Sequence, residues 1–139
     1  LAHIPVERDR FSVFTSYDHP FAGLPSVSLA EALRQIMVFP PLNSRENDSP
    51  LLHRIFRPSQ SDDYSSQNLE ECLLQVALGR GIAILPRSSV GPQYTVCSVP
   101  ISDVIDSFTM DLLWDPQRTT PLMERFLSLA ETQIDPEAL

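Results

Sequence analysis

The stretch from Leu73 to Ser88, LLQVALGRGIAILPRS, decides the fold because it holds a helix, a glycine turn and an apolar strand in immediate succession. We expect the helix to end at Gly79 in a left-handed cap and the apolar run 82–85 to form a strand that Pro86 stops. The helix begins upstream, where apolar residues repeat at the three- and four-residue steps of an amphipathic helix: Leu69, Cys72, Leu73, Val76 and Ala77.

Strand and helix patterns also alternate on the N-terminal side of this stretch. Residues 10–16 alternate apolar and polar, which indicates a strand with Phe11 and Val13 on one face. Ser28 and Glu31 form a capping-box pattern that opens a short helix through Leu33.

The next segments continue the alternation as far as the central helix. The apolar run 36–39 before two prolines is typical of a strand buried on both faces. Ser49 and Pro50 are typical of a helix start, and residues 57–64 are expected to hold an irregular edge strand. Alternating strands and helices predict an α/β protein with three layers, αβα, around a mixed and mostly parallel sheet.

The C-terminal third predicts two more strands and one helix. Residues 96–101 and 108–114 are extended segments, and Thr120-Pro121 opens a final helix. That helix carries an apolar stripe made of Leu122, Phe126, Leu129 and Ala130.

The length, charge and hydropathy of the chain limit the classes of protein to which it can belong. The 139 residues, 42% of them hydrophobic, are enough for one domain with a real core. Eighteen acidic against ten basic residues give a formal charge of −8, and an acidic surface repels the phosphates of DNA. Without an apolar run of about 18 residues or a signal-peptide pattern, we expect a cytoplasmic protein with no membrane contact.

No residue pattern predicts a catalytic site, a metal site or a cofactor. Cys72 and Cys97 are far apart and are expected to be reduced core thiols in preference to a disulfide. His19 lacks a nucleophile motif, so a structural role is favoured over a general base. The pairs Asp62-Asp63 and Glu70-Glu71 are adjacent in sequence, which favours solvated faces.

The loops that follow strands are the candidate site. Ligands of open α/β sheets bind outside the carboxyl ends of the strands, where helix N-termini direct N–H groups outward. These loops are residues 16–18, 40–44, 63–66 and 86–88.

The order of these segments resembles the effector-binding region of LysR-type bacterial transcription regulators. Residues 11–22, FSVFTSYDHPFA, are similar to the family's crossing strand with its His-Pro-x-Ala ending, and residues 73–88 are the most similar stretch. Shorter similarities occur at 26–29 (SVSL), 99–101 (VPI), 112–114 (LLW), 120–122 (TPL) and 126–127 (FL).

This resemblance implies a fold like that of type 2 periplasmic binding proteins, in which two α/β subdomains enclose an effector. Residues 1–116 would be the second subdomain with the crossing strands, and residues 117–139 a helix and tail that return to the first. DNA would be bound only through a helix-turn-helix domain that this chain lacks. The apolar stripe of the last helix would be exposed, or covered by a second copy or by another part of the same chain, and self-association is expected.

The resemblance also implies the residues of the effector wall. They are Ser16 and Tyr17 after the crossing strand, Phe39, Pro40 and Asn43 after the next, and Tyr64 and Ser65 at the start of the strong helix. Arg45 would bind a carboxylate of the effector as a bidentate donor. Two alternatives remain at this point, namely part of an exported solute-binding protein and a dimerisation module that binds no ligand.

Overall fold

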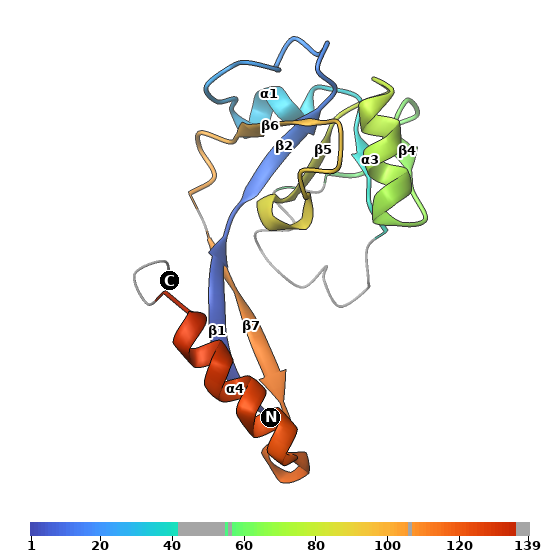
Figure 1. Cartoon of the computed structure of the whole chain (residues 1–139). Helices are drawn as coiled ribbons and strands as arrows, with labels where there is room; N and C mark the ends of the chain where they lie inside the picture. The colour runs from blue at the N-terminus through green and yellow to red at the C-terminus, as the bar shows by residue number, and fades with distance from the viewer. Residues whose placement is uncertain (42–54, 56, 106, 136–139) are drawn as a thin grey trace. The chain divides into compact units, whose positions relative to one another are not determined.

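The computed structural model describes residues 1–41, 55, 57–105 and 107–135 (Figure 1). The chain divides into two compact units, one of residues 10–106 and one of residues 1–9 with 107–139. The helix start expected at Ser49-Pro50 lies outside the described residues. The sequence-based division into 1–116 and 117–139 stays a prediction.

The sheet of the larger unit is built around β2 (Phe11–Thr15), which lies between β5 (Ala83–Pro86) and β6 (Cys97–Pro100) and is antiparallel to both. A second pair, β3 (Val38–Phe39) and β4 (Tyr64–Ser65), is parallel. β4 begins only at Tyr64, the last residue of the stretch 57–64 in which an edge strand was expected.

Backbone hydrogen bonds around Ile82 join the two groups of strands. The Val38 N–H donates to the Ile82 carbonyl at 2.8 Å, and the Ile82 N–H donates to the Ile36 carbonyl at 2.9 Å, which is a parallel bridge. The strand order is therefore β4, β3, β5, β2, β6. The predicted α/β class with a mixed sheet is confirmed; its antiparallel pairs are those made by β2.

Every residue of β2 is buried, which differs from the one-sided burial expected from its alternating pattern. Ser12 and Phe14 pair with Leu85 and Ala83 on one side of the sheet, whereas Val13 lies on the opposite side. Both sides are covered, so even the polar side chains of a central strand lose contact with water.

Two helices of the larger unit form as their caps predict. Ser28 and Glu31 make the predicted capping box at the start of α1 (Leu29–Leu33). α3 (Leu69–Ala77) packs on β2, β3 and β5. Its apolar side, with Cys72, Leu73 and Val76, joins one core with Phe14, Val38, Ala83 and Leu85. Gly79 follows at φ +78°, the left-handed cap expected there.

The smaller unit pairs the two ends of the chain. β1 (Ala2–Asp9) runs antiparallel to β7 (Phe108–Trp114) along their whole length. β1 is not predicted from the sequence, because Pro5 lies at an irregular pairing and most of its residues are exposed, so no two-residue period forms. Short 3₁₀ turns occur at Arg87–Ser89 (η2) and Pro116–Arg118 (η3).

The last helix, α4 (Pro121–Gln133), is capped by Thr120 and has no buried residue. Its apolar stripe is open, with Leu122 77%, Phe126 57% and Leu129 64% exposed. The stripe is thus exposed in the single chain, and its cover by a second copy stays a prediction. No helix in the described ranges is long and apolar enough to cross a membrane.

Gly81 makes the bridge around Ile82 possible, since the backbone of Ile36 passes directly over its Cα. A Cβ placed on Gly81 would lie 2.5 Å from the Ile36 carbonyl oxygen. That oxygen accepts the hydrogen bond from Ile82, so it cannot move without loss of the link between β3 and β5.

Gly81→Ala is therefore expected to lower the free energy of unfolding by about 2 to 4 kcal/mol, the range of a backbone clash in a packed site. Gly91→Ala is the matched control, because its Cβ would meet only the end of the flexible Gln93 side chain. Urea unfolding of both variants measures the difference. Equal midpoints for the two variants would contradict the close approach at Gly81.

Candidate functional site

The parallel strands of the larger unit end together at one edge of the sheet. β3, β4 and β5 end at Phe39, Ser65 and Pro86, and we call this side the carboxyl edge. The opposite side, where these strands begin, is the amino edge. The N-terminus of α3 opens three residues after Ser65, where the Asn68 side chain accepts a hydrogen bond from the Glu71 N–H at 2.8 Å.

Four of the predicted effector residues lie on the two strands β3 and β4 or directly after them. Phe39 ends β3 and is half-buried, as is Pro40 beside it. Tyr64 and Ser65 make up β4, and both are exposed. Asn43 and Arg45 lie outside the described residues, so their predicted roles rest on the sequence alone.

Ser16 and Tyr17 lie at the other edge of the sheet. The expectation that all strand-end loops share one edge is wrong for these two residues, because β2 is antiparallel to β5 and ends where β5 begins. Ser16 lies beside the end of α3, since a Cβ on Gly79 would be 3.8 Å from its hydroxyl oxygen. The structure therefore does not group Ser16 and Tyr17 with Phe39.

Arginine guanidinium groups lie over two of the aromatic side chains that are predicted to contact the effector. The Arg57 side chain lies over the Phe39 ring at 5.8 Å from its centre, and Arg80 lies over the Tyr64 ring at 5.6 Å. Each arrangement is a cation–π contact. Neither arginine has a motif in the sequence that indicates this role.

Arg57 is held by a nearly buried ion pair with Asp63. Its two terminal nitrogens donate to the two carboxylate oxygens of Asp63 at 2.6 and 2.8 Å, and its Nε donates to the Leu33 carbonyl at 3.0 Å. The same carboxylate accepts the N–H groups of Met37 and Gln60. The loop after residue 57 is thereby fixed to the start of β3.

The solvated face expected for Asp62-Asp63 is wrong for Asp63, whose side chain is only 1% exposed. The Arg57 guanidinium holds the pKa of Asp63 at about 2, below its ordinary value of 3.8, although burial opposes the shift. Two adjacent acidic residues in a polar loop look equally solvated in a sequence. Only the fold brings Arg57 to one of them.

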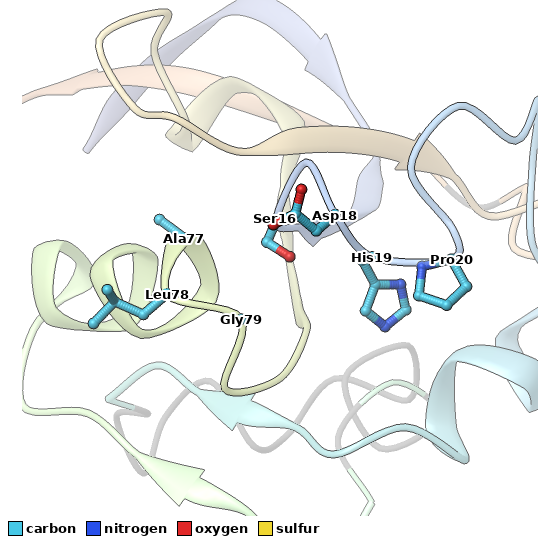
Figure 2. Close-up of a pocket in the computed structure, with 7 residues that line it drawn as sticks. All are labelled: Ser16, Asp18, His19, Pro20, Ala77, Leu78 and Gly79. Atoms are coloured by element: carbon cyan, nitrogen blue, oxygen red, sulfur yellow. The ribbon is translucent and has the colours of Figure 1, made fainter.

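A pocket of about 280 Å³ opens at the amino edge, between the turn after β2 and the end of α3 (Figure 2). Its lining residues all belong to the larger unit: Ser16, Asp18, His19, Pro20, Ala77, Leu78 and Gly79. We call it the amino-edge pocket.

His19 forms a wall of this pocket and is tied into the local turn. Its Nδ1 accepts a hydrogen bond from the Phe21 N–H at 3.0 Å, and the two rings are in edge contact. Burial lowers the pKa of His19, and a hydrogen bond with Gln35 opposes that shift. The neutral imidazole thus serves the turn, which is the structural role favoured from the sequence.

The cysteines are both free, as expected from the sequence. Cys72 is buried under β3, and burial raises the pKa of its thiol to about 11, so it is not a reactive thiolate at neutral pH. Among the described residues, no three His, Cys, Asp or Glu side chains are placed to hold a metal ion.

The family model described as the LysR substrate binding domain matches residues 1–135. The chain belongs to this family. The LysR substrate-binding domain is thus represented over nearly the whole chain, and the periplasmic-binding-protein-like α/β fold implied by the resemblance is confirmed. The alternatives of an exported solute-binding protein and of a bare dimerisation module are not favoured by this match.

Solved structures agree with this LysR domain in fold. The effector-binding domain of QuiR in complex with shikimate is 19% identical, with a TM-score of 0.69, over 93% of this chain and 63% of that one. HinK, a LysR family regulator from Pseudomonas aeruginosa, is 19% identical with a TM-score of 0.73, over 95% of this chain and 48% of that one.

A reduced form of OxyR from N. meningitidis is 16% identical to the LysR domain, with a TM-score of 0.70, over 99% of this chain and 65% of that one. This chain therefore spans between about half and two thirds of these proteins. Comparison with curated protein sequences gave no match.

The Arg57–Asp63 pair leads to a testable expectation for stability. At pH 7, Asp63→Asn should lower the free energy of unfolding by about 3 kcal/mol, because the guanidinium is left in a nearly buried site without its counter-charge. Since the pKa of Asp63 is lower in the folded chain, the stabilisation is present above about pH 4 and is lost as pH falls towards 2.

Urea unfolding at pH 7 and at pH 2.5 measures both effects. The gap between the unmodified chain and Asp63→Asn should be large at pH 7 and small at pH 2.5. Asp62→Asn, the same change at the exposed neighbour, serves as the control and should have little effect at either pH. A similar loss in the two variants at pH 7 would rule out the pair as a stabilising contact.

Proposed function

We propose that this LysR substrate-binding domain is the cytoplasmic, effector-sensing part of a bacterial transcription regulator and that its effector binds at the carboxyl edge. The observation that carries the proposal is the family match over residues 1–135. Solved neighbours support it, since one of them is an effector-binding domain in complex with shikimate. The role is regulatory and not enzymatic.

The carboxyl edge supports a ligand site for two physical reasons. Three strand ends and the N-terminus of a nine-residue helix converge there, so backbone N–H groups and the positive end of the helix dipole face the same region. Phe39 and Pro40 add half-buried apolar surface beside the exposed Ser65. Such an edge favours a small anion with an apolar part.

We further propose a carboxylate as the effector class, with Asn43 and Arg45 as its polar contacts. This assignment rests on the sequence, in which Asn43 and Arg45 follow β3 by only a few residues. An arginine binds a carboxylate through two parallel hydrogen bonds, which gives orientation as well as affinity. Ser16 and Tyr17, on the amino edge, are not part of this proposed site.

The proposed mechanism is a shift of conformational balance. The chain passes between its two units twice, after Asp9 and before Ser107. We propose that a ligand at the carboxyl edge stabilises one conformation of the regulator over another. We propose that residues 117–139 return to the first subdomain of the regulator, that the regulator self-associates, and that DNA contact belongs to a separate helix-turn-helix domain.

Thermal melting of the chain with a panel of small carboxylates tests the site. At a concentration near 100 times Kd, a carboxylate that binds only the folded chain should add about 2.7 kcal/mol, which is roughly 9 °C in Tm for a domain of this size. Ser65→Ala and Arg45→Gln should each reduce the shift.

Ser98→Ala is the matched control, because Ser98 is exposed on β6 away from the carboxyl edge. Its Tm shift should equal that of the unmodified chain. An equal shift in Ser65→Ala, Arg45→Gln and Ser98→Ala would remove the carboxyl edge as the binding site. A chain that melts cooperatively but responds to no carboxylate would contradict the proposed effector class.

A further inference from the structure

The amino-edge pocket lies at the opposite end of α3 from the proposed effector edge, and its lining is distinct. None of its seven lining residues carries a positive charge, whereas Asp18 contributes a carboxylate. The pocket also contains the hydroxyl of Ser16, a residue that is only 8% exposed. A cavity with oxygen acceptors and no cation favours a positively charged guest.

The end of α3 adds to this preference. Ala77, Leu78 and Gly79 close one side of the pocket, and they are the last residue of the helix, its C-cap and the left-handed glycine after it. The C-terminal end of a helix carries the negative end of its dipole and attracts cations within the last turn. Two independent sources of negative potential therefore meet in one cavity.

The polar groups of the pocket are available to a guest. Within the described part of the chain, no hydrogen bond engages the Ser16 hydroxyl or the Asp18 carboxylate. Arg80 directly follows Gly79 in the sequence, but its guanidinium lies over the Tyr64 ring. His19 accepts a hydrogen bond from the Phe21 N–H and makes another with the Gln35 side chain. No side chain of the pocket thus serves as an internal counter-ion for Asp18.

The size and rim of the pocket limit what enters. Its volume of about 280 Å³ is just below the usual range for drug-sized ligands, roughly 300 to 1,000 Å³, so the guest is small. Pro20, Ala77 and the exposed Leu78 are the apolar residues of the lining, on either side of Ser16 and Asp18 (Figure 2). A short alkyl chain that ends in an ammonium group matches both parts.

We propose that the amino-edge pocket binds a small organic ammonium ion. Its charge pairs with the Asp18 carboxylate, and its N–H groups donate hydrogen bonds to the Ser16 hydroxyl oxygen and to carbonyl oxygens at the end of α3. This second ligand site is independent of the effector proposal, because it involves the other edge of the sheet and the opposite charge. One domain then receives two chemical signals, one at each end of the same helix.

Amide NMR of the chain with three probes of equal size tests this site. Butylammonium, butanol and butyrate differ in charge but share the alkyl part. Butylammonium should give saturable shift changes confined to the amides of residues 16–19 and 77–79, while butanol and butyrate should give none there. Equal changes with butanol would overturn the proposal, since an apolar cavity alone would explain them.

Variants separate the pocket from the acidic surface in general. Asp18→Asn should weaken butylammonium about fivefold, the value of one partly exposed ion pair. Asp62→Asn, the same change at an exposed aspartate outside the pocket, should leave Kd unchanged. Leu78→Arg, at an exposed rim position, should abolish binding without disturbance of the fold. Equal Kd values for Asp18→Asn and Asp62→Asn, or changes scattered over the whole surface, would overturn the site.

Discussion

The parallel bridge at Ile82 is the interaction on which the larger unit depends. Two backbone hydrogen bonds, from Val38 to Ile82 and from Ile82 to Ile36, join the β3–β4 pair to the three strands around β2. Without them α3 would cover two separate ribbons, and no edge would have more than two parallel strand ends. The close passage at Gly81 is the steric condition for this bridge, so a residue without a side chain decides whether the sheet is continuous.

The elements that the sequence predicts well are those whose signal is local. The capping box before α1, the apolar period of α3, the glycine cap and the strand before Pro86 all arise within a few residues of chain, and the structure has each of them. Side-chain hydrogen bonds to the first turn and the steric freedom of glycine act over the same short distances. These features therefore appear in the sequence as plainly as in the fold.

The features that the sequence did not reveal depend on the relative direction of paired strands and on contacts between residues that are not neighbours in the sequence. Whether β2 runs with or against β5 is invisible in an apolar pattern, yet it moves Ser16 and Tyr17 from one edge of the sheet to the other. Asp63 resembles its exposed neighbour until Arg57 is brought to it. β1 lacks a two-residue period because most of its residues are exposed and Pro5 lies at an irregular pairing, and its partner strand is about a hundred residues away in the sequence.

The openness of α4 has a consequence for its own persistence. It has thirteen residues and no buried side chain, a length at which isolated helices are marginal in water, because nucleation is costly and few hydrogen bonds follow it. Its Thr120 cap and Pro121 help it to start, but packing supplies most helical stability in proteins. The helical content of this segment, followed by circular dichroism, is therefore a direct gauge of how completely a neighbouring surface covers its leucines and phenylalanine.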